Sequence, residues 1–339
     1  MGAPQKALHP QSFEFLGAVM QEKSRNSSRG YLIGLSATVF LSFTGILISY
    51  LNRAYHLPSL VLAFWRDCFV ALGLIIVFTF FKRSRLGLDR AHWVFFILYG
   101  LTLSLFNSLW TFSVQFNGAA IATVLAFSSP AMTAVLAHFI LKEQINGVKL
   151  SSIGMSLLGT ALVSGAVDPS AWKVNASGII FGLLTGLFFA IYTLLGKTSS
   201  NKSIDPWTTM LYGFSSAVFF LFLFNLITNV FTGQALFSNF LWLGTSLSGW
   251  AILIFLGIGP TVGGYGLYLM SLGYLPATIA NLIGALEPAF TAIWAYMIFH
   301  EQLTIIQFIG SLLVFASVFL LRLGEGNRRS ENPPTVEVS

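Results

Sequence analysis

Long apolar segments follow one another along this chain, separated by short polar gaps. Each covers about 17–25 residues, which as an α-helix is enough to cross a hydrocarbon layer of ~30 Å. The pattern predicts an all-α membrane protein with ten transmembrane helices. The ten segments are Tyr31–Leu51, Pro58–Phe81, Trp93–Val114, Ala119–Leu141, Val148–Val167, Gly178–Leu195, Pro206–Val230, Trp250–Leu272, Pro276–Phe299 and Ile305–Leu321.

Composition supports this class. Hydrophobic residues make up 55% of the 339 residues, charged residues make up 9%, and the mean hydropathy is +0.77. A water-soluble domain of this size could not cover so much apolar surface. The net charge of +6 also occurs in nucleic-acid-binding proteins, but here the Lys and Arg residues lie in the gaps between apolar segments. We therefore expect a lipid bilayer around the protein and no nucleic acid.

Positive charge predicts the orientation in the membrane. With ten spans both termini lie on one side, and cytoplasmic loops are rich in Lys and Arg. If the termini are cytoplasmic, the outside holds only Arg53 and Lys173. The plasma membrane is the expected location. The inside then holds Lys6, Lys23, Arg25, Arg29, Lys82, Arg83, Arg85, Arg90, Lys142, Lys149, Lys197, Lys202, Arg322, Arg328 and Arg329.

The chain also contains an internal repeat. A shift of 158 residues places Ile121–Gln144 on Ile279–Gln302. The matched helices are the fourth and the ninth, so five spans separate them and the second copy is inverted in the membrane. Inverted repeats are typical of secondary transporters that work by alternating access. Identical pairs include Ala122 with Ala280, Pro130 with Pro288, Ala131 with Ala289, Thr133 with Thr291, Ala134 with Ala292, Ala137 with Ala295 and Glu143 with Glu301.

These matched residues resemble the EamA branch of the drug/metabolite transporter superfamily. The proline helices that end in an acidic residue carry the resemblance, together with Leu286-Glu287-Pro288 and with Arg66, where the family often has an arginine. Phe214 departs from the pattern, because it aligns with Arg66 in the second repeat. The resemblance implies two five-helix repeats over residues 30–167 and 174–323, between cytoplasmic tails over 1–29 and 324–339. It also implies transport of metabolites such as amino acids and their derivatives.

Proline residues interrupt the predicted helices near the membrane midplane. Pro130 and Pro288 lie ~17 Å into their spans, and Gly259-Pro260 lies at similar depth in the eighth. Proline displaces the carbonyl four residues earlier, and in lipid that carbonyl needs protein or water as a partner. The predicted breaks therefore either line a central cavity or are packing kinks.

Glu287 is predicted to lie at the same depth. A lipid-exposed carboxylate there would cost at least ~2.5 kcal/mol, so it must be protonated, paired or facing water. It would bind either a proton or a substrate amine, or else serve as a structural carboxyl at the broken helix. Its counterpart in the first repeat is the neutral Ser129.

Arg66 is predicted to lie ~12 Å deep in the second span, where it needs an anion or several carbonyl groups as partners. Asp67 is not expected to be that partner, because neighbouring positions on a helix diverge by about 100°. The alternatives are an ion pair with Glu287, an anionic group of a substrate, or a clamp on helix ends.

Aromatic and amide residues coincide in the two repeats. At the 158-residue shift Asn107, Trp110 and Thr123 meet Tyr265, Tyr268 and Asn281 in that order. A cavity with aromatic walls and a few polar anchors would suit small amphiphilic metabolites. The alternative is helix packing with hydrogen bonds between helices.

Glu143 and Glu301 lie ~20 Å beyond their prolines, at opposite membrane surfaces. Asn146 and Thr304 follow them and are good N-cap residues for the next helix. This pattern favours a structural role in the turns, with gating as the alternative.

The complete pattern predicts a secondary transporter of small molecules, with protons as a candidate coupling ion. His300-Glu301 lacks the second histidine of a zinc helix, and Gly196-Lys197-Thr198 lacks the earlier glycine of a phosphate loop. We therefore expect no metal, no cofactor and no enzymatic activity. The remaining alternative is a non-transporting receptor or scaffold on the same fold.

Overall fold

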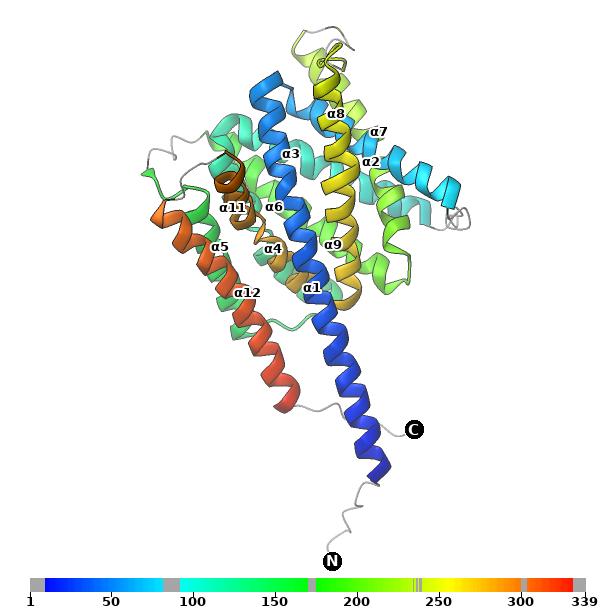
Figure 1. Cartoon of the computed structure of the whole chain (residues 1–339), viewed down its shortest axis with the longest axis vertical. Coiled ribbons are helices and arrows are strands. Elements are labelled where there is room, and N and C mark those ends of the chain that lie inside the picture. Colours follow the sequence, from blue (N-terminus) through cyan, green and yellow to red (C-terminus); the bar gives the residue numbers. More distant parts are fainter. Residues whose placement is uncertain are drawn as a thin grey trace, which may run out of the picture.

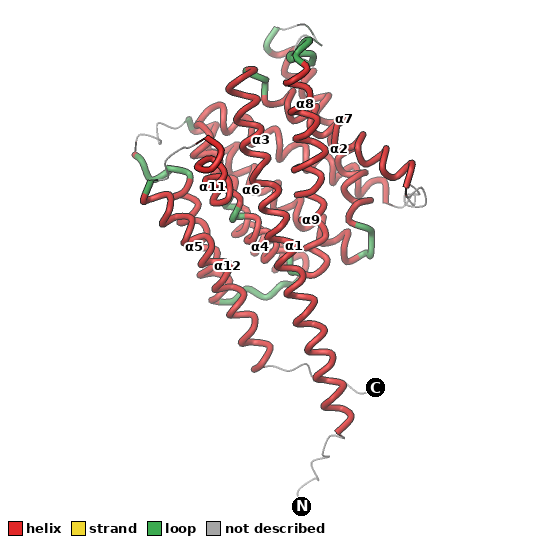
Figure 2. Tube along the Cα trace, in the orientation of Figure 1, coloured by secondary structure: helices red, strands yellow, loops and turns green. Residues whose placement is uncertain are grey.

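A computed structural model of the chain describes residues 10–81, 92–169, 175–233, 235, 237, 240–299 and 304–331. Every regular element within these ranges is helical (Figures 1 and 2). The elements are α1 (Pro10–Tyr55), α2 (Ser59–Phe81), α3 (Trp93–Ala126), α4 (Ser129–Leu141), α5 (Gly147–Val163), α6 (Ala176–Asn201), α7 (Pro206–Phe231), α8 (Leu247–Leu256), the π-helical turn η4 (Gly257–Thr261), α9 (Val262–Tyr274), α10 (Ala277–Gly284), α11 (Glu287–Phe299) and α12 (Ile305–Glu331).

Nine segments of the described chain are long and apolar enough to cross a membrane. The predicted fifth span corresponds to α5, which has 17 residues and lies at the short end of membrane-crossing helices. The described chain therefore has nine to ten candidate spans. The nine are Asn26–Tyr55, Ser59–Phe80, Trp93–Asn117, Ile121–Leu141, Ala176–Asn201, Pro206–Phe231, Leu247–Tyr274, Ala277–Ile298 and Ile305–Gly324.

Helix α3 joins the predicted third and fourth spans without a loop, but it does not run straight. A Cβ atom placed on Gly182 of α6 would lie 2.8 Å from Ser113 Oγ and 2.7 Å from Leu125 Cβ. A straight helix would hold Ser113 and Leu125 ~18 Å apart. The chain therefore reverses direction within α3, and α6 packs against both of its arms.

The two proline helices are interrupted at matching positions. In the first repeat α3 ends at Ala126 and α4 begins at Ser129. In the second, α10 ends at Gly284 and α11 begins at Glu287, and the same 158-residue shift relates both boundaries. The repeated proline is the second residue of the helix after each break, where its missing N–H is not needed.

Contrary to the prediction of a helix break at Gly259-Pro260, this proline lies inside a continuous helix. The π-helical turn η4 contains Pro260 and connects α8 to α9. The displaced carbonyl is that of Leu256, and Thr261 Oγ1 donates a 2.7 Å hydrogen bond to it. The wider turn and this hydrogen bond satisfy the backbone where proline offers no donor.

Small residues allow the closest helix contacts. Helix α6 packs closely through Gly182 and Gly186, and a Cβ atom on Gly186 would lie 2.6 Å from Ser128 Oγ. Helices α5 and α12 meet through Gly159 and Gly310, and a Cβ atom on either would lie 2.8 Å from the other's carbonyl oxygen. Such backbone approach is how helices associate where lipid removes the hydrophobic driving force.

Helices α1 and α12 both extend beyond the bundle at the same end of the molecule, which we call the termini end (Figure 1). Arg322 of α12 lies over the ring of Tyr31 of α1 there, 5.7 Å from its centroid. The turn after α9 lies at this end too, because a Cβ atom on Gly30 would meet Leu275 at 2.8 Å.

Candidate functional site

Buried hydrogen bonds join the two helix breaks. Ser129 Oγ, at the start of α4, donates to Asn281 Oδ1 of α10 over 2.9 Å. Asn281 Nδ2 donates to Thr193 Oγ1 of α6 over 3.0 Å, and Thr193 shares a 2.8 Å hydrogen bond with Tyr268 OH of α9. None of these four side chains is more than 2% exposed. The breaks of the two repeats are thus tied to each other and to α6 inside the protein.

Helix α1 supplies partners for the second break. Thr38 Oγ1 donates to the carbonyl of Ile283 over 3.2 Å, just before the break. After the break, Thr291 Oγ1 donates to the carbonyl of Ser42 over 3.2 Å, and Trp294 Nε1 donates to Ser42 Oγ over 2.9 Å. These bonds hold α1 against the interrupted helix, and Thr38 adds a second donor to the Ile283 carbonyl, which also accepts from the Leu286 N–H.

Arg66 and Asp67 of α2 form a buried ion pair. Arg66 Nε donates to Asp67 Oδ1 over 2.9 Å, and Nη2 lies 2.9 Å from the same oxygen. Asn107 Nδ2 of α3 donates to Asp67 Oδ2 over 3.3 Å. Arg66 is 6% exposed and Asp67 is 0% exposed. The prediction that Asp67 would not be the partner is wrong, because the long Arg66 side chain reaches back across the angle between neighbouring helix positions.

Glu287 lies near this pair without joining it. It interacts electrostatically with Arg66 and with Tyr265. Within the described ranges, however, the ion pair of Arg66 is with Asp67 and not with Glu287. The Glu287 residue is partly accessible, unlike the buried pair. As the first residue of α11 it also lies where the helix dipole favours negative charge.

Aromatic rings pack beside these polar groups. Tyr192 of α6 stacks on Tyr268 with ring centroids 6.5 Å apart, and Phe189 stacks on Tyr268 at 6.1 Å. Tyr265 meets Tyr192 edge-on at 5.9 Å and Phe214 at 5.4 Å. Phe214 therefore contributes a ring to this cluster.

The structure gathers most of the predicted binding residues. Asn281 and Tyr268 share one hydrogen-bonded chain, and Asn107 reaches Arg66 through Asp67, with Tyr265 and Glu287 nearby. No hydrogen bond or ring contact in the described ranges links Trp110 or Thr123 to this group.

Sequence reasoning missed Asp67 as a partner and missed Thr193 and Ser42 altogether. Asp67 was visible as a charge inside an apolar segment. Thr193 and Ser42 carried no signal, because single hydroxyl residues are common in membrane helices. The described residues contain no group of His, Cys, Asp and Glu that could hold a metal ion.

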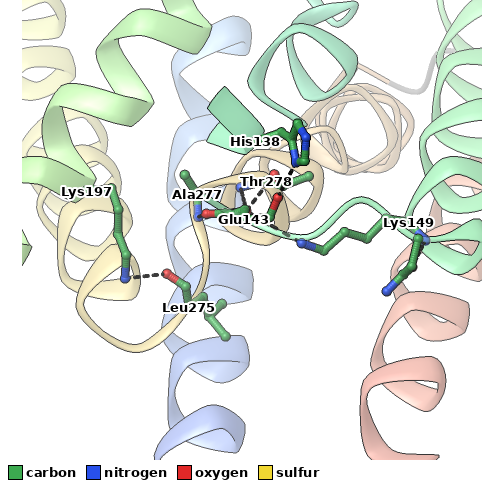
Figure 3. A network of polar contacts seen from close by, with 8 residues as sticks. His138, Glu143, Lys149, Lys197, Leu275, Ala277 and Thr278 are labelled. Carbon is green, nitrogen blue, oxygen red and sulfur yellow. Dashed lines mark hydrogen bonds and ion pairs between the residues drawn. The ribbon is translucent and has the colours of Figure 1, made fainter. Parts of the chain in front are cut away.

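A second polar network lies at the termini end (Figure 3). Glu143, in the loop after α4, accepts a 2.6 Å hydrogen bond from the backbone N–H of Ala277 and a 2.8 Å hydrogen bond from Thr278 Oγ1. Ala277 begins α10, whose N-cap residue Pro276 offers no side-chain cap. Lys149 Nζ of α5 lies 3.6 Å from Glu143 Oε2. Glu143 thus caps, from the first repeat, a helix of the second.

The turn between α9 and α10 is also held by a residue of α6. Lys197 Nζ of α6 donates to the carbonyls of Leu272 and Leu275, over 2.7 and 2.9 Å, at the C-terminal end of α9. A carboxylate at one helix start and an ammonium group at the preceding helix end both match the helix dipoles. Glu301 lies outside the described residues.

The N-caps expected near these two glutamates are confirmed. Asn146 caps α5 through a 2.7 Å hydrogen bond from the backbone N–H of Lys149. Thr304 Oγ1 accepts a 3.2 Å hydrogen bond from the backbone N–H of Gln307 at the start of α12. Each cap satisfies a backbone donor that the first turn of a helix leaves free.

Several known proteins with similar sequences are named as uncharacterized transporters. An uncharacterized transporter of Clostridium kluyveri is 28% identical over 63% of this chain and 67% of its own length. The uncharacterized inner membrane transporter YicL of Salmonella typhimurium is 24% identical over 89% of this chain and 98% of its own. A crystal structure at 16% identity shares the fold, with a TM-score of 0.71 over 90% of this chain and 99% of that one.

The family comparison covers most of the chain. The model of the EamA-like transporter family matches residues 28–165 and again residues 176–323. The resemblance seen in the proline helices is therefore confirmed, and the apolar helices are those of a multi-pass integral membrane protein. This chain belongs to the EamA-like transporter family.

Proposed function

We propose that this protein is a secondary transporter that moves small metabolites across the membrane by alternating access, without an enzymatic step. The observation that carries the proposal is the Ser129–Asn281 hydrogen bond, which connects two helix breaks at equivalent positions of the repeats. Interrupted helices at a repeat interface near the midplane are where such transporters bind substrates. Amino acids and their derivatives are the candidate substrates, and protons are the candidate coupling ion.

The proposal includes ten spans, with α5 counted among them, as two inverted five-helix repeats. Both termini would be cytoplasmic and the plasma membrane would be the location. Two observations support this topology. Helices α1 and α12 project from one end (Figure 1), and Lys149, Lys197 and Arg322 all lie at that end.

Cysteine labelling tests this topology. In a Cys68→Ser background, Asn175→Cys should react with a membrane-impermeant maleimide added outside intact cells. Ser330→Cys should react only after the membrane is opened, because α12 carries it to the cytoplasmic side. External labelling of Ser330→Cys would contradict the orientation and the inverted repeat together.

Within the transport cycle we assign Glu143 to the cytoplasmic gate. Its hydrogen bonds to Ala277 and Thr278 connect the first repeat to the second at the termini end. A contact that crosses between repeats must break when one repeat moves against the other. This geometry favours gating over a role confined to the turn.

A receptor or scaffold on the same fold is the alternative function. The buried Arg66–Asp67 pair and the accessible Glu287 argue against it, because charges inside a membrane are costly and usually functional.

Flux measurements decide between these functions. Purified protein in proteoliposomes should show saturable uptake of a radiolabelled amino acid or amine, and unlabelled substrate inside should accelerate it. Liposomes without protein are the control. A scaffold would give no protein-dependent flux for any compound of such a panel.

A further inference from the structure

Charged residues are few in the membrane interior. Across the candidate spans of the described chain, Arg29, Arg53, Lys197 and Arg322 lie within about one helical turn of a span end. Long basic side chains at such positions can reach the membrane surface. Away from the span ends, the charged residues are Arg66, Asp67 and Glu287.

Two of these three residues neutralise each other. Asp67 Oδ1 accepts a hydrogen bond from Arg66 Nε and lies 2.9 Å from Nη2, while Asn107 holds the second carboxylate oxygen. Both members of the pair are nearly inaccessible. Arg66 is therefore already paired with a carboxylate, and only 6% of the residue is exposed.

Glu287 is the most exposed member of the trio. It is partly accessible and is the first residue after the second helix break, on the far side of that break from Asn281 of α10. With Arg66 compensated by Asp67, the interior carries one negative charge in excess when Glu287 is ionised. A negative charge inside a membrane needs a positive partner, and away from the span ends Arg66 is the one basic residue of the described spans.

We propose that the central site takes a ligand with a positively charged amine, that Glu287 is its counter-ion, and that Arg66 is not an anion-binding residue. This inference rests on the proposed transport function and specifies its substrate class. It also replaces the interpretation that Arg66 orients a negative group of the substrate. Tyr265, which interacts electrostatically with Glu287, offers a ring that suits the apolar part of such an amine and attracts its charge.

Three probes of matched shape and different charge test the proposal: 2-phenylethylamine, 2-phenylethanol and 3-phenylpropionate. Thermal unfolding of the purified protein with each probe measures binding, because a ligand of the folded state stabilises it by mass action. Wild type should be stabilised by the amine, weakly by the alcohol and not by the acid. In Glu287→Gln the apparent affinity for the amine should fall at least ~10-fold, to that of the alcohol.

Glu325→Gln is the matched control, because it makes the same chemical change just beyond the span Ile305–Gly324 and should leave the amine response intact. Glu287→Asp keeps the charge and should retain a response, so the test survives if Glu287→Gln does not fold. Stabilisation by 3-phenylpropionate, an amine response that persists in Glu287→Gln, or no amine response in wild type would each overturn the proposal.

Uptake of the same probes into proteoliposomes separates this inference from the proposed function. Binding of the amine without any flux would leave the substrate class standing and reject transport of it. Flux of the acid with no response to the amine would support transport and reject the amine site.

Discussion

Asp67→Asn should lower the free energy of unfolding by about 3–5 kcal/mol, the usual cost of leaving one member of a buried ion pair without its partner. Arg66 is 6% exposed and its guanidinium group contacts Asp67 Oδ1 through both Nε and Nη2. Asparagine is nearly the same size, so the loss reports the missing charge and not a cavity. Denaturant unfolding in detergent, followed by tryptophan fluorescence, measures it.

The double variant Arg66→Gln/Asp67→Asn is the control. It removes both charges, so it should be more stable than Asp67→Asn alone, and together with the single variant Arg66→Gln it completes a cycle that isolates the coupling between the two residues. An exposed ion pair contributes up to about 1 kcal/mol. If Asp67→Asn lowers the free energy of unfolding by less than this, Glu287 compensates the charge of Arg66 instead of Asp67. That result would also contradict the amine site.

Glu143→Ala should shift the protein toward states that are open at the termini end. The carboxylate accepts hydrogen bonds from the Ala277 backbone and from Thr278 Oγ1 at the start of α10. Losing these charge-assisted bonds should favour the open state by about 2 kcal/mol, or ~30-fold in its population. Glu143→Gln keeps one acceptor oxygen, so its effect should be intermediate.

A cysteine one turn into α10 reports the shift. Ala280 is 1% exposed, so Ala280→Cys in a Cys68→Ser background should react slowly with an impermeant maleimide in inside-out vesicles. Glu143→Ala should accelerate the reaction, whereas Glu325→Ala should not. An unchanged rate in Glu143→Ala, with transport intact, would restrict Glu143 to a structural role in the turn.

Some of this architecture follows from local rules. A long apolar segment is stable in lipid as a helix, because a helix satisfies the backbone groups within the segment and the surroundings offer no partner. A proline in such a segment weakens the helix at a defined carbonyl wherever it occurs. The two breaks, after Ala126 and after Gly284, could therefore be located from Pro130, Pro288 and the shift between them.

The same local rules were insufficient at other prolines and charges. Pro260 did not break its helix, because the Thr261 hydroxyl satisfied the displaced carbonyl of Leu256. Arg66 was expected to pair with Glu287, with a substrate anion or with helix ends, but the flexible side chain reached its sequence neighbour Asp67. The nearest partner of a charged side chain depends on its rotamer and on the space and hydrogen-bonding groups that neighbouring helices provide. The hydrogen bond from Asn107 of α3 to Asp67 is an example.

The sequence by itself determined the membrane class, the two proline breaks and the placement of Glu287 at the second of them, because these depend on the polarity of single segments and on the repeat shift. Only the tertiary structure decided that Asn281 meets Ser129 and Thr193, that Asp67 neutralises Arg66, and that Glu143 caps α10. Each of these contacts depends on where a side chain points and on how far apart its partner lies. Hydrogen bonds require atoms within about 3 Å of each other, and helix periodicity does not set distances between helices.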